Sequence, residues 1–204
     1  MGTLDELGLK YGTDKSSKGH GYLDIYEKYF EPIKDQKLNM LEIGVFNGAS
    51  MKIWRDYFVN SQIFGIDYVD KSEYDAERIK TIIADQANRE QLTKVFQDLP
   101  EMDIIIDDGG HTMEQQQVSL GILFPYLKDG GIYVIEDLGT SRPRWARIYN
   151  KERTSKTTSW MINNFIETKK IDSEYITPEE ARYVEKNTLS CKMGTVEIVF
   201  IKKV

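Results

Sequence analysis

Cysteine, histidine and long apolar runs are all scarce in this chain of 204 residues. The single cysteine, Cys191, excludes an internal disulfide and fits a reducing compartment. One cysteine and two histidines cannot build a zinc-type Cys/His cluster. The longest apolar stretches, such as 104–106 and 198–201, are far too short to cross a bilayer. The first residues lack the basic segment and apolar core of a signal peptide, so we expect a cytoplasmic protein.

Charge of one sign is not in large excess either. The 27 basic and 33 acidic side chains give a net charge of −6, which argues against a general nucleic-acid binder. Hydrophobic content of 40% and charged content of 29% are typical of a globular protein. No repeat or linker interrupts the sequence. We therefore expect one domain over 1–204, with a mostly helical preface at 1–36 and a core at 37–204.

Strand-like and helix-like segments alternate from residue 38 onward, which is typical of a parallel sheet. The expected strands are 38–45, 62–67, 80–84, 102–107 and 131–136, and the expected helices are 49–58, 89–96, 113–127 and 158–168. The tail differs, because 182–191 and 195–204 are strand-like and joined through 192–194, a pattern that indicates an antiparallel hairpin. The predicted fold class is α/β: a mostly parallel seven-stranded sheet with an antiparallel C-terminal hairpin and helices on both faces.

Two acidic pairs each follow a run of β-branched residues. Asp107 and Asp108 precede His111, and Glu136 and Asp137 end the next expected strand. Ligands of open α/β sheets bind outside the carboxyl ends of the strands, so these carboxylates are expected at one rim. Four clustered anions require a proton or a cation, and a hard divalent ion suits oxygen ligands. The nearby imidazole suggests a general base, or else a helix-start residue hydrogen-bonded to a neighbouring carboxylate.

The first expected strand ends in a glycine-containing turn that suits a cofactor. Gly44 and Gly48 allow a tight turn and a close approach of the backbone to a ligand. Glu42 within this turn would repel a pyrophosphate but suits a cationic cofactor. Phe46 and Ala49 stand where a full dinucleotide-binding motif has glycines, which disfavours a nicotinamide-dependent dehydrogenase.

Polar residues also end the second and third expected strands. Asp67 is placed to accept both hydroxyls of a ribose, and Asp85 with Gln86 is placed at the polar edge of an adenine. Any one of these could be an ordinary strand-end residue. Acids at the ends of five successive strands are much less expected by chance.

These residues carry a resemblance to a known family. The segment Glu42-x-Gly44-x-x-x-Gly48, with Asp67, Asp85 and the closing hairpin, resembles the class I S-adenosylmethionine-dependent methyltransferases, whose fold is Rossmann-like. A narrower resemblance, to the macrocin/mycinamicin sugar O-methyltransferases, rests on three segments: Tyr11-Gly12-Thr13-Asp14-Lys15 with His20 and Tyr22, Asp107-Asp108-Gly109-Gly110-His111, and Glu136-Asp137. Two departures are Gly110, where these enzymes commonly have serine, and the shortness of the chain, which lacks the long N-terminal region of some members.

The resemblance implies S-adenosylmethionine and Mg²⁺ as cofactors and a sugar hydroxyl as the methyl acceptor. It implies Asp108, Glu136 and Asp137 as magnesium ligands and His111 as the general base, and we place Asp107 against the methionine end of the cofactor. A catechol-type O-methyltransferase is the closest alternative. A non-catalytic cofactor-binding protein is the alternative of another class, although it would have little need of the metal-competent acids.

A basic segment, 141–156, follows the last acidic pair and carries six basic side chains and one acid. It is either a solvated loop or a cover for the acceptor. In the second case Arg142 and Arg144 suit phosphate oxygens, and Trp145 and Tyr149 supply aromatic faces for a sugar or a base. The expected partner is a small sugar-containing acceptor, either a glycosylated natural product or a phosphorylated or nucleotide-linked sugar. Neither nucleic acid nor a membrane is expected, and homo-oligomerisation is left open.

Overall fold

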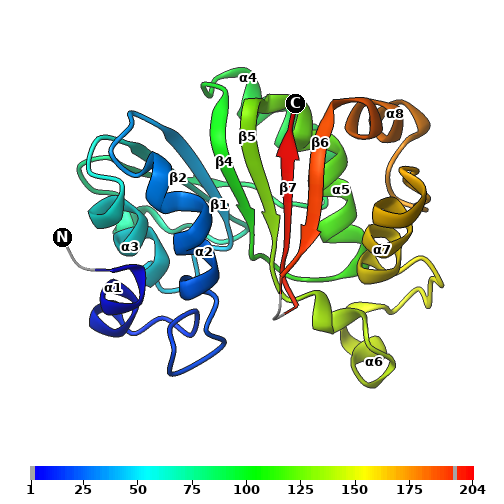
Figure 1. The fold of residues 1–204 in the computed structure, drawn as a ribbon, viewed down its shortest axis with the longest axis horizontal. Helices are drawn as coiled ribbons and strands as arrows, with labels where there is room; N and C mark the ends of the chain where they lie inside the picture. The colour runs from blue at the N-terminus through cyan, green and yellow to red at the C-terminus, as the bar shows by residue number, and fades with distance from the viewer. Residues whose placement is uncertain (1–2, 195–196) are drawn as a thin grey trace.

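The structure, a computed structural model, describes residues 3–194 and 197–204, and it confirms the predicted fold class (Figure 1). Seven strands form one sheet in the order β3-β2-β1-β4-β5-β7-β6. The parallel strands are β1 (Asn39–Ile43), β2 (Gln62–Asp67), β3 (Ile79–Ile83), β4 (Met102–Asp107) and β5 (Leu127–Ile135). β7 (Val199–Lys203) pairs antiparallel with β5 and with β6 (Thr188–Met193).

Helices cover both faces of the sheet because its central strands are apolar on both sides. On one face lie α1 (Leu4–Tyr11), α2 (Leu23–Phe30) and α3 (Ala49–Tyr57), packed around Trp54, Tyr26 and Phe30. On the other lie α4 (Arg89–Gln97), α5 (Met113–Leu123), α7 (Thr158–Thr168) and α8 (Pro178–Asn187). Figure 1 shows the sheet between these two layers. Within the expected preface at 1–36, the described residues form α1, α2 and a short 3-10 helix at Glu31–Ile33.

The C-terminal hairpin is shorter than predicted, and the assignment of 182–187 to a strand is wrong. These residues complete α8, whose N-terminus is fixed by a capping box between Thr177 and Glu180. Ala181 and Val184 are buried one turn apart, as a helix requires. Residues 195–196, placed at the start of the second predicted strand, lie outside the described residues. The predicted helix 113–127 also ends earlier, at Leu123, and β5 starts at Leu127.

The order of the strands determines where a ligand can bind. β1 pairs with β2 on one side and with β4 on the other, so the chain reverses its direction of winding between β1 and β4. The crevice outside the carboxyl ends of such neighbouring strands is the usual binding site of an open α/β sheet. β4 pairs with β5 on its other side, so the carboxyl ends of β1, β4 and β5 lie side by side.

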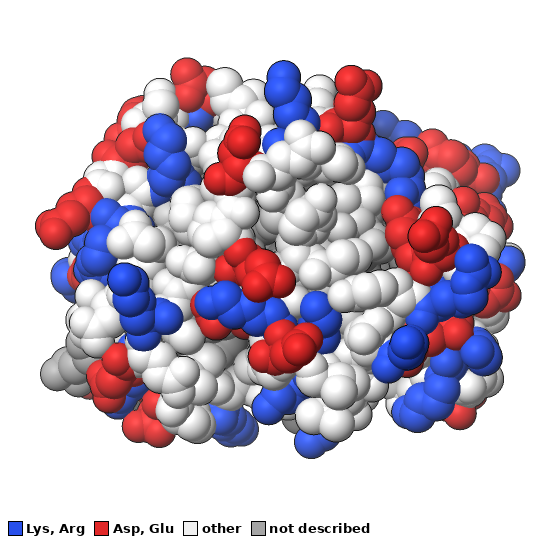
Figure 2. Space-filling model, turned by 90° about the horizontal axis from the view of Figure 1, so that it is seen from above, with Lys and Arg blue, Asp and Glu red and all other residues white. Residues whose placement is uncertain are grey.

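The surface carries charge of both signs. Figure 2 shows the end of the molecule at which β7 and the chain terminate, and there lysines and arginines are interspersed with aspartates and glutamates. None of the helices within 3–194 and 197–204 combines the length and apolar character that a membrane span needs.

Candidate active site

A cavity of about 820 Å³ opens at the carboxyl ends of the parallel strands. Most of the residues predicted at this rim line it together: Gly44, Asp67, Asp85, Gln86, Asp108, His111 and Asp137. Its wall also includes Gly12–Lys15, the segment between α1 and α2, which the sequence analysis singled out only as part of a family motif. The preface therefore contributes directly to the site.

The turn after β1 is built around Gly44. Its φ of +93° lies in the left-handed region, and a Cβ there would stand 2.1 Å from the backbone oxygen of Asp108. Only glycine allows the β1 and β4 ends to approach this closely. Asp67 holds the same turn, because its Oδ2 accepts hydrogen bonds from the backbone N–H groups of Val45 (3.1 Å) and Phe46 (3.2 Å). Gly48 starts α3 with φ of +70°, so both predicted glycines occupy positions that favour glycine.

Asp107 does not share the rim with its neighbour. It is fully buried, outside the residues that line the cavity, and it accepts hydrogen bonds from Gln86 Nε2 (3.0 Å) and the Ser119 hydroxyl. Gln86 in turn accepts from the backbone N–H of Gly110 at 2.8 Å. Asp107 and Gln86 thus brace the loop that presents Asp108 and His111. Asp85 is exposed and lines the cavity.

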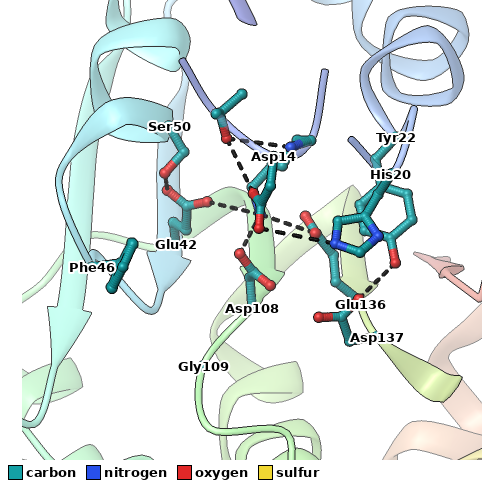
Figure 3. Close-up of polar contacts among 12 residues, drawn as sticks. Asp14, His20, Tyr22, Glu42, Phe46, Ser50, Asp108, Gly109, Glu136 and Asp137 are labelled. Atoms are coloured by element: carbon teal, nitrogen blue, oxygen red, sulfur yellow. Dashed lines mark hydrogen bonds and ion pairs between the residues drawn. The ribbon is translucent and has the colours of Figure 1, made fainter. Parts of the chain in front are cut away.

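Three carboxylates converge from three different strand ends (Figure 3). Glu42, Asp108 and Glu136 all lie around the ammonium group of Lys15, whose side chain is only 3% exposed. Lys15 Nζ donates to Glu136 Oε2 at 2.9 Å and to Asp108 Oδ2, and it lies 3.9 Å from Glu42 Oε1. The sequence predicts Asp107 in this group of acids, but Glu42 lies there instead.

Burial of these groups changes their pKa values. Burial raises the pKa of the Glu136 carboxyl well above its usual range, the neighbouring Asp108 adds to the rise, and Lys15 opposes it. Burial likewise raises the pKa of Glu42 to about 7, against the influence of Lys15. For Lys15, burial alone lowers the pKa, but the carboxylates of Asp108, Glu136 and Glu42 together raise it well above its usual value. Each acid gains stabilisation of its charged form from the one ammonium.

Two tyrosines from the preface complete the cluster. Tyr26, in α2, donates its hydroxyl hydrogen bond to Glu136 Oε1. Tyr22, at the start of the same helix, donates to Asp137 Oδ1 at 2.6 Å. Both tyrosines have a pKa raised by burial and by these acids, so they act as donors. The sequence gives no signal for Tyr26, and it gives Lys15 only as part of a family motif, because both look like ordinary residues of an amphipathic helix and a polar loop.

The cavity side of the cluster offers a set of atoms suited to a divalent cation. Asp108, His111 and Asp137 each present one ligand atom, and these atoms all lie within 4.8 Å of one another. His111 Nε2 lies 3.5 Å from Asp137 Oδ2 and 4.0 Å from Asp108 Oδ1. Glu136 lies behind them, with its two oxygens engaged by Tyr26 and Lys15. The oxygen-rich donor set fits Mg²⁺.

His111 and Asp137 share an uncommon backbone conformation, with φ of +57° and +54°. Left-handed backbone in residues other than glycine is sparsely populated and is often found at functional sites. Among the described residues, His111 Nδ1 has no hydrogen-bond partner, although it is buried. The imidazole lies edge-on to the Tyr149 ring, with 6.2 Å between the two ring centroids.

The basic segment lies beside the site but does not line the cavity. Arg142 forms an ion pair with Glu197, and Arg144 lies 5.7 Å over the ring of Trp145. Trp145 is 41% exposed and packs edge-on near Tyr149, at 6.4 Å between centroids. Tyr149, at the end of the short helix α6 (Ala146–Tyr149), is the member of this segment whose ring contacts a predicted catalytic residue.

Comparison with known proteins agrees with this geometry. The chain is 34% identical over 172 residues to mycinamicin VI 2''-O-methyltransferase of Micromonospora griseorubida, a match that covers 80% of this chain and 43% of that enzyme. It is 35% identical over 145 residues to demethylmacrocin O-methyltransferase of Streptomyces fradiae, with 68% and 37% covered. The chain therefore spans less than half the length of these relatives. No protein-family model matches it.

A solved structure extends the similarity over the whole fold. The MycE methyltransferase from the mycinamycin biosynthetic pathway, in complex with Mg, SAH and mycinamycin VI, superposes with a TM-score of 0.85 at 30% identity. The match covers 99% of this chain and 54% of that one. The chain thus belongs to the class I S-adenosylmethionine-dependent methyltransferases, in the family of the macrocin and mycinamicin sugar O-methyltransferases.

Proposed function

We propose that this protein transfers a methyl group from S-adenosylmethionine to a hydroxyl of a sugar-containing small molecule, with Mg²⁺ bound at the acceptor. The observation that carries the proposal is a single cavity that joins two kinds of site. One end has the strand-end polar residues Asp67, Asp85 and Gln86, and the other has Asp108, His111 and Asp137. Donor and acceptor can therefore meet in one enclosed space.

The donor end is suited to a nucleoside with a cationic substituent. Asp67 and the exposed Asp85 line the cavity, where carboxylates can accept hydrogen bonds from ribose hydroxyls or an adenine edge. The Gly44 turn lets the backbone approach the ligand. Glu42, Gly48 and Asp107 support this end from behind the cavity wall, with Asp107 acting through Gln86 rather than by direct contact.

The acceptor end is suited to a neutral alcohol. Asp108 and Asp137 would hold Mg²⁺, with Glu136 as the third acid of the set. When bound, the ion would stabilise negative charge on a coordinated hydroxyl oxygen. His111 lies beside both acids and would accept the hydroxyl proton as the oxygen attacks the methyl carbon. A carbon–oxygen bond forms, the carbon–sulfur bond breaks, and S-adenosylhomocysteine leaves as the neutral thioether.

The test is a methyl-transfer assay of the 204-residue chain with labelled S-adenosylmethionine and two acceptor panels, one of sugars and one of catechols. Turnover of a sugar, abolished by EDTA and restored by Mg²⁺, is the expected result. Preferred turnover of a catechol would replace the sugar acceptor by the catechol-type alternative. Full activity of rigorously metal-free protein would contradict the metal roles of Asp108 and Asp137.

The identity of the acceptor is proposed only as a class. The relatives are named for mycinamicin VI and demethylmacrocin, and a sugar hydroxyl of a glycosylated natural product is the first acceptor to test. A nucleotide-linked sugar is the second, because Arg142, Arg144 and their neighbours flank the site with basic charge. Since the chain is shorter than its relatives, the same assay also tests whether these residues act alone as one domain.

A further inference from the structure

The backbone that carries Lys15 is tightly fixed. The N–H of His20 donates to the Asp14 oxygen at 2.7 Å, and the N–H of Leu23 donates to the Lys15 oxygen at 3.1 Å. At Gly19, a Cβ would stand 2.0 Å from the Asp14 oxygen, so the loop closes on itself only with glycine there. The loop therefore delivers the Lys15 side chain to one place, and its burial is a built feature of the fold.

That place is enclosed by acids. Asp108 turns Oδ2 to the ammonium and Oδ1 toward His111, so its two oxygens face two different neighbours. Glu136 turns Oε2 to the ammonium and Oε1 to Tyr26. Glu42 Oε1, fully buried, has no hydrogen-bond partner among the described residues and lies 3.9 Å from Lys15 Nζ. Buried lysines are rare unless paired, and this one is paired on three sides.

We propose that Lys15 is a positioning residue of the metal centre. Its ammonium orients Asp108 and Glu136, and it partly neutralises the negative charge that attracts a divalent cation to Asp108 and Asp137. The inference rests on the proposed function, because it assumes that the cation binds there. The Lys15 ammonium lies among Glu42, Asp108 and Glu136, whereas Asp108, His111 and Asp137 present the ligand atoms for the cation. The cation is then held next to His111 and the acceptor.

This arrangement has a consequence that a purely structural lysine would not have. Two like charges in one cluster repel each other, so Lys15 lowers the affinity of the centre for the divalent cation. Without the ammonium, the inner carboxylates are uncompensated and attract the cation more strongly. The same change lets the cation move inward, away from His111. Loss of Lys15 should therefore increase metal affinity and decrease turnover.

The experiment measures Mn²⁺ binding by electron paramagnetic resonance, without acceptor, in wild type and Lys15→Met. We expect the Mn²⁺ dissociation constant of Lys15→Met to fall at least about tenfold, equivalent to about 1.4 kcal/mol. Turnover with saturating Mg²⁺ should fall at the same time. Lys15→Arg keeps the charge and should bind Mn²⁺ within about threefold of wild type. The matched control is Lys10→Met, which removes the same charge from a side chain that is 58% exposed and outside the cavity, and should leave binding unchanged.

Unchanged or weaker Mn²⁺ binding by folded Lys15→Met would overturn the inference and leave the proposed function intact. Absence of Mn²⁺ binding by wild type would overturn both. If Lys15→Met does not fold, as judged by circular dichroism, Lys15→Gln provides the second test. Glutamine keeps hydrogen-bond donors for Asp108 and Glu136 but removes the charge, so the Mn²⁺ dissociation constant of Lys15→Gln should fall as it does for Lys15→Met.

Discussion

Replacement of His111 by asparagine isolates the proposed proton transfer from the other functions of the site. Asparagine tolerates the left-handed φ of +57° that His111 adopts, so the backbone of the loop should persist. The amide cannot accept a proton at neutral pH, however. A positioned general base contributes about 10²–10⁴-fold to rate. Because each tenfold loss corresponds to about 1.36 kcal/mol, we expect the activation barrier to rise by about 2.7–5.4 kcal/mol.

The structure also predicts what this substitution leaves unchanged. The polar residues at the donor end, Asp67 and Asp85, follow different strands from His111. Their carboxylates accept hydrogen bonds from backbone N–H groups and not from His111. The dissociation constant of S-adenosylmethionine should therefore stay within about twofold of wild type, since the binding energy of that end is untouched. Calorimetry measures this constant, and single-turnover transfer of labelled methyl measures the chemical step.

The chain offers a matched control in its other histidine. His20→Asn makes the same substitution at a side chain that is 51% exposed and outside the cavity lining, and turnover should change less than tenfold. A loss below tenfold in His111→Asn would refute the role of the imidazole as base. A parallel loss of S-adenosylmethionine affinity would instead assign His111 to cofactor binding.

Three further predictions use other parts of the structure. Gly44→Ala should destabilise the fold by about 2–5 kcal/mol, because it adds a steric clash to a left-handed backbone. Gly130 has a similar φ but faces open space, so Gly130→Ala should cost only about 1–2 kcal/mol. Thermal melts of the two variants measure the difference. Burial raises the pKa of Cys191 to about 12, so little of the reactive thiolate is present at pH 8. Alkylation of Cys191 by iodoacetamide at pH 8 should therefore be on the order of 10³-fold slower in the folded protein than in the urea-unfolded chain. Equal rates would contradict the burial of this thiol. If the basic segment binds a phosphorylated acceptor, Arg144→Ala should lower kcat/KM for a nucleotide-linked sugar about tenfold or more, without lowering it for the free sugar. Equal effects on the two acceptors would identify 141–156 as a solvated loop.

The strand ends were predictable from the sequence because their signal is local. The apolar runs that end β2, β4 and β5 each stop at an acidic residue, and parallel strands bring such residues to one edge. The error in the tail has a local cause as well. Residues 182–187 contain residues that suit a strand, but the capping box at Thr177 starts a helix that continues through them.

The orientation of individual side chains at that edge could not be predicted. Asp107 and Asp108 are adjacent, yet one points inward to Ser119 and the other toward the cavity, a difference set by the alternation of side chains at the end of β4. The burial of Lys15 depends on carboxylates from three strands that lie far from it in sequence. A lysine in a polar loop carries no local signal of such partners, because its environment exists only in the assembled fold.

The loop that carries Lys15 also affects the order in which the site can form during synthesis. Domains generally begin to fold from the N-terminus as the chain leaves the ribosome. Lys15 precedes Glu42, Asp108 and Glu136 in the chain, so the cation emerges before any of the acids that surround it. As each strand joins the sheet, its terminal carboxylate meets a positive charge that is already available. The nascent protein can thus bury these acids at the carboxyl ends of its strands before it acquires a metal ion from the cell.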